Sequence, residues 1–167
     1  MFSISSAMSG SLQYATRRRT PWDALMRHWR DRRQRRIGRT LQRIQDEHVR
    51  SLRSAHAGVR FAAVLAPQGE RLSSTADGQG PLNSDQAVVD VVCAEAARRS
   101  KARWQTGHAA TPIFPTVLGN ALCRRVSAGS YEALMLIVLD PRVGDAHALW
   151  LGRYAARELS SQVGLAL

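Results

Sequence analysis

The feature of the sequence that most constrains the fold is a run of seven consecutive apolar residues, Ala133–Leu139, which Asp140 and Pro141 end. A run of this length is typical of a strand. Side chains alternate between the two faces of a strand, so a strand that is apolar at every position needs cover on both faces. We therefore place Ala133–Leu139 at the centre of a sheet.

Short apolar runs bounded by turn residues predict the rest of the sheet. The Pro67-Gln68-Gly69 turn indicates a β-hairpin, and turns at Gly119 and at 128–130 separate the later runs. The predicted strands are Val59–Ala66, Glu70–Thr75, Ile113–Val117, Ala121–Val126 and Glu132–Leu139.

Apolar residues at helical spacing predict helices over Ser84–Arg99 and Asp145–Val163, with Asp145 as the N-cap of the second. Small residues, including Gly152, would let this last helix lie close to a sheet or to another helix. A further helix is expected to begin at Pro21, capped by Thr20. Gly38 leaves two interpretations open, one long helix or two in series.

The charge is concentrated in the first part of the chain. The 167 residues include 24 basic and 13 acidic ones, a net charge of +11, and residues 1–60 hold 14 arginines and 4 acidic residues. The remaining residues are close to neutral. We divide the chain into a disordered tail (1–19), an Arg-rich amphipathic helical extension (20–41) and a folded domain (42–167). The tail also has the composition of a transit peptide, which is the alternative interpretation of residues 1–19.

The basic helix carries the strongest candidate binding residues, because arginines surround and follow an apolar face that contains two tryptophans. We expect it to contact an acidic or grooved protein partner or an anionic membrane surface, and we rank nucleic acid lower. A helix that packs on the domain with solvated arginines is the structural alternative. The candidate residues are Trp22, Met26, Trp29, Arg30, Arg32, Arg33, Arg35 and Arg36.

Other chemistry finds little support in the sequence. Cys93 and Cys123 are far apart, which argues against a zinc ribbon or a disulfide scaffold, and we expect packed thiols. His48 and His56 could share a helix face, but without further ligands we expect surface histidines. No phosphate-binding loop motif and no run long enough to cross a membrane is present. We expect no catalytic residue, metal or cofactor.

Two stretches resemble the Roadblock superfamily, of dynein light-chain and bacterial GTPase-regulator type. They are GVRFAAVLAPQGERLSST (Gly58–Thr75) and GNALCRRVSAGSYEALMLIVLDPRVGDAHALWLGRYAAREL (Gly119–Leu159), and the helix over Ser84–Arg99 fits between them. The resemblance covers residues 42–163 and implies an α+β fold, a five-stranded antiparallel sheet with flanking helices (Roadblock/profilin-like). Residues 1–41 depart from the family, so an N-terminal basic helix precedes this fold.

The resemblance also implies a function. It implies a non-enzymatic regulator or scaffold that acts on a small Ras-like GTPase or a motor or secretion complex. It further implies a homodimer, or a heterodimer with a paralogue, through the middle helix and a sheet edge. We expect a cytoplasmic location with peripheral contact at the inner membrane surface.

Two alternatives remain open. One is a GAF/PAS-like ligand-sensing module, which would need a pocket lined by Phe61, Trp104 and Phe114, although the region Trp104–Pro115 is short for such a pocket. The other is a nucleic-acid-binding protein that uses the Arg-rich arm.

Overall fold

The computed structural model describes residues 21–75, 86–105 and 113–167. Within these ranges, the structure does not describe the side chains of residues 21–24, 27, 104 and 105. The chain divides into two units, 1–34 and 35–167, and each is described by itself. The expected tail (1–19) and the Thr20 cap lie outside the described residues.

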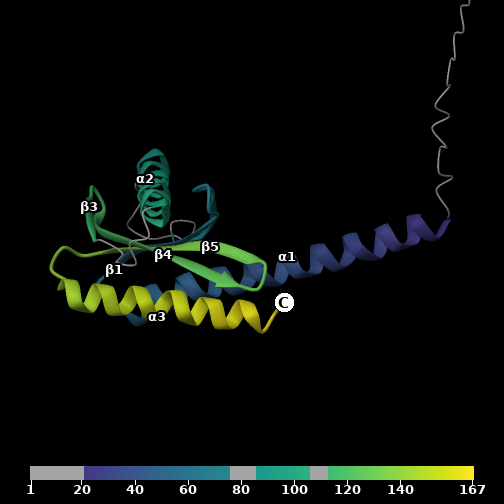
Figure 1. The fold of residues 1–167 in the computed structure, drawn as a ribbon. Coiled ribbons are helices and arrows are strands. Elements are labelled where there is room, and N and C mark those ends of the chain that lie inside the picture. Colours follow the sequence, from purple (N-terminus) through teal and green to yellow (C-terminus); the bar gives the residue numbers. More distant parts are fainter. Residues whose placement is uncertain (1–20, 76–85, 106–112) are drawn as a thin grey trace, which may run out of the picture. The chain divides into compact units, whose positions relative to one another are not determined.

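Eight elements follow one another in the predicted order of helix, two strands, helix, three strands and helix (Figure 1). They are α1 (Pro21–Ala55), β1 (Val59–Leu65), β2 (Arg71–Ser74), α2 (Gln86–Gln105), β3 (Phe114–Thr116), β4 (Gly119–Ala128), β5 (Tyr131–Leu139) and α3 (Asp145–Gly164).

The strands form one antiparallel sheet in the order β2-β1-β5-β4-β3. The apolar run Ala133–Leu139 lies in the central strand β5, and all seven of its residues are buried, as predicted. On one side β5 pairs with β1, with Leu134 opposite Leu65, and on the other it pairs with β4, with Ala128 opposite Tyr131.

Helices cover both faces of the sheet (Figure 1). On one face Met135, Ile137 and Leu139 pack in a core cluster with residues of α1 and α3. On the other face Leu134, Leu136 and Val138 pack with residues of α2. The alternation of β5 side chains therefore supplies two separate core layers.

Helix α1 continues without a break through Gly38, which decides between one helix and two. Its later turns are fastened to the sheet by hydrogen bonds. Gln45 Nε2 donates to Tyr131 Oη at 2.7 Å, and Ser73 Oγ donates to Asp46 Oδ1 at 2.5 Å. Because Gln45 is buried, its bond to Tyr131 satisfies an amide that would otherwise lack a partner.

The N-cap of helix α3 lies one residue before the expected position. Gly144 is the N-cap, with extended backbone and no side-chain hydrogen bond, and Asp145 is the first helical residue, so the prediction of Asp145 as N-cap was wrong. The carboxylate still lies in the first turn, where it interacts favourably with the helix dipole. Gly152 faces Leu122 of β4, and a Cβ at this glycine would lie 2.3 Å from Leu122 Cδ1. The predicted close approach of α3 is confirmed.

Candidate functional site

The predicted binding residues of α1 form a run of exposed side chains. Trp29 and Met26 are 67% and 57% exposed. The five candidate arginines are all exposed, and none forms an ion pair with a described residue. The side chain of Trp22 lies outside the description. Helical spacing places Met26, Trp29 and Arg33 on one face of α1, so apolar and cationic groups are available together.

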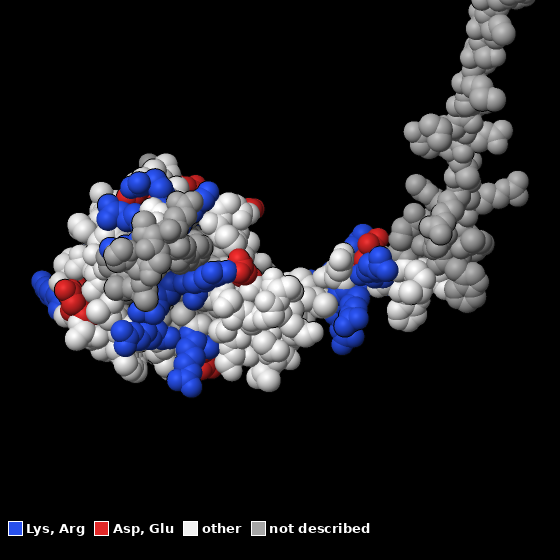
Figure 2. Space-filling view, viewed as in Figure 1, with Lys and Arg blue, Asp and Glu red and all other residues white. Residues whose placement is uncertain are grey.

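A second basic area lies on the folded unit. Figure 2 shows Lys and Arg side chains gathered over the face where β4 and α3 lie. Burial, and then the charge of Arg153 on α3, lower the pKa of Arg124 on β4. Arg124 Nε is buried without a hydrogen-bond partner among the described residues. Arg124 and Arg153 thus lie near each other, and neither forms an ion pair with a described residue.

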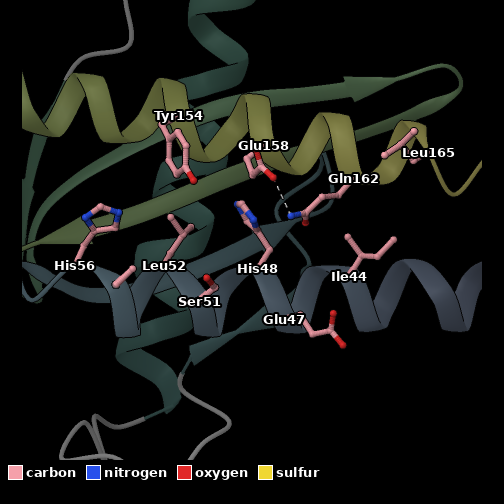
Figure 3. Close-up of a pocket in the computed structure, with 11 residues that line it drawn as sticks. Ile44, Glu47, His48, Ser51, Leu52, His56, Tyr154, Glu158, Gln162 and Leu165 are labelled. Carbon is pink, nitrogen blue, oxygen red and sulfur yellow. Dashed lines mark hydrogen bonds between the residues drawn. The ribbon is translucent and has the colours of Figure 1, made fainter.

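A groove of about 520 Å³ runs between α1 and α3 (Figure 3). A volume of this size is within the range of ligand sites in proteins, about 300–1,000 Å³. Polar groups from both helices line it, along with a few apolar side chains. The residues of the lining are Ile44, Glu47, His48, Ser51, Leu52, Ala55, His56, Tyr154, Glu158, Gln162 and Leu165.

His48 is the most unusual group in this groove. It is only 5% exposed, and its Nε2 has no hydrogen-bond partner among the described residues. Burial lowers its pKa, while a hydrogen bond to the backbone of Ala155 and the charge of Glu158 act in the opposite direction. A neutral imidazole has one donor and one acceptor nitrogen. Since the ring donates to the backbone of Ala155, Nε2 is assigned as the free acceptor.

Four aromatic rings border one end of the groove. Trp150 stacks on Tyr154 with ring centroids 5.5 Å apart and an interplanar angle of 8°, and His147 stacks on Trp150 at 5.7 Å. His56, just beyond the end of α1, approaches Trp150 edge-on at 6.3 Å. Trp150 and Tyr154 are 52% and 46% exposed. We call these four residues the aromatic ladder.

The groove and the aromatic ladder were not predicted as sites. His48 and His56 both line the groove, but His56 lies beyond the end of α1, so the expectation that they share a helix face was wrong. The prediction that His48 is a surface histidine was also wrong. The spacing of His147, Trp150 and Tyr154 at i, i+3 and i+7 is the sequence signal that could have revealed the ladder.

Helix α2 has an exposed apolar stripe on the side away from the sheet. Val91 is 68% exposed, and Ala94 is exposed on the same face. This stripe is therefore apolar surface without cover from the described residues.

Cys93 and Cys123 are buried free thiols, as expected, and burial raises their pKa to about 11 and about 12.

Metal-binding clusters and membrane-spanning helices are both absent from the part of the chain that the structure describes. No group of three or more histidine, cysteine or acidic side chains there comes together to hold a metal ion. None of the helices there combines the length and apolar character that crossing a bilayer requires.

The sheet order, with α2 on one face and α1 and α3 on the other, defines a Roadblock/profilin-like α+β fold. Solved structures with this fold match the chain. The gliding protein MglB from Thermus thermophilus is 14% identical, with 74% of this chain and 90% of that chain covered and a TM-score of 0.50. A Roadblock/LC7 domain from Streptomyces avermitilis is 17% identical, with 68% and 95% covered and a TM-score of 0.47.

MglB from Myxococcus xanthus is 12% identical, with 78% of this chain and 92% of that chain covered and a TM-score of 0.46. No protein-family model matches the sequence, and no curated protein matches it significantly. At identities this low the matches establish the fold alone. The predicted Roadblock/profilin-like fold is confirmed.

Proposed function

We propose that this protein is a non-enzymatic, dimeric regulatory or scaffold protein that acts on a small Ras-like GTPase or on a motor or secretion complex. The observation that carries the proposal is the exposed stripe around Val91 on α2, the helix that packs on one face of the sheet. An apolar helix face without cover favours pairing with a second copy. Such pairing through the middle helix is also what the Roadblock resemblance implies.

The packing of the core supports a scaffold over the GAF/PAS-like sensor. Phe61 and Phe114, two of the three residues that would line a sensor pocket, are buried in the core cluster beneath α2. The third, Trp104, has its side chain outside the description. A partner would therefore bind to the surface of the domain.

Within this proposal the arginines of α1 hold the partner. Exposed cations without an ion pair among the described residues attract an acidic protein surface or an anionic membrane at the cytoplasmic side. Trp22 and Trp29 act as anchors, because tryptophan is among the side chains that contribute most to binding when an interface buries them. The same arginines would serve the nucleic-acid alternative, in which they would contact phosphates.

Light scattering tests the dimer. We expect a mass of about 37 kDa, twice the 18.4 kDa of one chain. Val91→Glu should give a monomer, because it places a charge in the buried centre of the interface. Leu165→Glu, at an exposed position of the opposite helix layer, is the matched control and should remain dimeric. A monomeric wild-type chain at micromolar concentration would refute the homodimer.

Salt dependence tests the arm. Capture of a partner from the source cells, or of vesicles with anionic lipids, should weaken as salt rises, since surface charges are screened over about 8 Å at physiological salt. Replacing Arg32, Arg33, Arg35 and Arg36 by Gln should abolish this salt dependence, and Trp29→Ala should weaken binding while leaving it in place. Capture that is unchanged in the Gln variant would exclude the arm.

A further inference from the structure

The groove between α1 and α3 combines three features that a positively charged hydrogen-bond donor could satisfy together. The first is His48 Nε2, a buried acceptor without a donor among the described residues. A buried acceptor without a partner destabilises the protein, so a ligand that supplies the donor recovers this free energy. Figure 3 shows His48 rising from α1 toward Glu158 of α3, in the middle of the groove.

The second feature is the carboxylate of Glu158. It accepts a hydrogen bond from Gln162 Nε2 at 3.1 Å, which orients the carboxylate across the groove from His48 (Figure 3). A carboxylate can accept about four hydrogen bonds, so Glu158 has capacity for further donors. Glu47, the other carboxylate of the lining, points away from α3 (Figure 3).

The third feature is the aromatic ladder. Tyr154 and His56 line the groove, and Trp150 extends the surface outward from them. A guanidinium is attracted to the face of a tryptophan or tyrosine ring, and its planar shape permits stacking. The half-exposed ring of Tyr154, which Trp150 backs by stacking, thus offers a face for a cation next to the carboxylate of Glu158.

We propose that this groove binds an arginine side chain presented by a basic segment of a partner protein. In that arrangement the guanidinium stacks on Tyr154, the member of the aromatic ladder that lies one turn from Glu158, and donates to Glu158 and to His48 Nε2. Arginine fits better than lysine, because its five donors in a planar fork can serve two acceptors and a ring at once. The site lies on the opposite layer of the fold from the α2 stripe, so it goes beyond the proposed dimerisation and does not depend on it.

The test uses the full chain and two peptides of equal length, an acetylated tetra-arginine amide and the same peptide with neutral citrulline. Binding is followed by NMR of the tryptophan indole N–H signals and the histidine ring signals, with Trp150 assigned from Trp150→Phe. We expect the arginine peptide to shift the signals of Trp150 and His48 saturably. The citrulline peptide should leave them in place.

Variants separate this site from general charge attraction. Glu158→Gln should weaken binding about tenfold or more, as expected for the loss of a charge-assisted hydrogen bond of about 1.5–3 kcal/mol. Tyr154→Ala should weaken it by about two- to fivefold, the range for an exposed cation–π contact of about 0.5–1 kcal/mol. Glu70→Gln, an exposed carboxylate in the β1–β2 turn, is the matched control and should bind like the wild type.

Three results would overturn the proposal. They are equal binding of the citrulline peptide, an equal loss of affinity in Glu70→Gln and Glu158→Gln, and shifts of the Trp150 and His48 signals by a tetra-aspartate peptide. A thermal unfolding curve for each variant identifies any that does not fold. In that case Trp150→Ala, at a half-exposed position, replaces it and should weaken binding about as much as Tyr154→Ala.

Discussion

Replacing Gly152 by alanine should destabilise the fold, although alanine is the better helix former. In a helix interior, alanine is favoured over glycine by about 1 kcal/mol. At this position the new Cβ would lie 2.3 Å from Leu122 Cδ1, whereas carbon atoms in contact prefer about 3.5–4.0 Å. Leu122 is completely buried, so its side chain cannot move without disturbing its neighbours. Overpacking of this kind costs about 1–3 kcal/mol, which outweighs the helix propensity and leaves a net loss of about 1 kcal/mol.

Two comparisons isolate the contact in urea unfolding followed by circular dichroism at one protein concentration. Gly38→Ala, where a Cβ meets nothing within 4 Å, should raise the free energy of unfolding by about 0.5–1 kcal/mol. Leu122→Ala removes the obstructing methyl groups and should itself cost about 2–5 kcal/mol. In that background Gly152→Ala should become stabilising. If Gly152→Ala stabilises the otherwise wild-type protein as Gly38→Ala does, α3 does not pack on β4 as closely as described.

Three further predictions concern the polar and thiol groups of the core. Tyr131→Phe should lower the free energy of unfolding by about 1–3 kcal/mol in urea titrations, because it leaves the buried Gln45 amide without its partner. His48 has a folded-state pKa below its ordinary 6.5, so the unfolded chain takes up its proton first on acidification and stability should fall below about pH 6.5; His48→Gln should flatten the pH profile of the melting temperature in that window. Cys93 and Cys123, with pKa values raised by burial to about 11 and about 12, should react with iodoacetamide at pH 8 only after unfolding, which mass spectrometry of the native and denatured protein can measure.

The sheet could be predicted from the sequence because its strongest signal, the run Ala133–Leu139, depends on local pattern alone. A strand that is apolar on both faces has few stable positions other than the centre of a covered sheet. The break considered at Gly38 does not occur, because one glycine costs a helix only about 1 kcal/mol and Leu41 and Ile44 pack against the core just beyond it. Local propensity therefore left that position open, and tertiary packing decided it.

The groove could not be predicted in the same way, because two helices far apart in the sequence create it. His48 and Glu158 come together only when α1 and α3 lie on the same face of the sheet. The sequence pattern identifies His48 as a helical residue, but it does not state whether α3 buries the ring. Burial, which sets both the lowered pKa and the unpartnered nitrogen, is a property of the assembled layer.

The place of β5 between β1 and β4 also sets an order of events during synthesis. Strand β1 is complete at Leu65, but its central neighbour β5 begins only at Tyr131. At about 5–20 residues per second, the ribosome leaves β1 without this neighbour for roughly 3 to 13 s. By contrast, β4 and β5 are joined by a short turn with a positive φ at Gly129 and can pair as soon as both emerge. The nascent β1–β2 hairpin therefore has an apolar edge without its partner strand. It is the segment most exposed to wrong pairing and to chaperones, and its pairing with β5 completes the sheet.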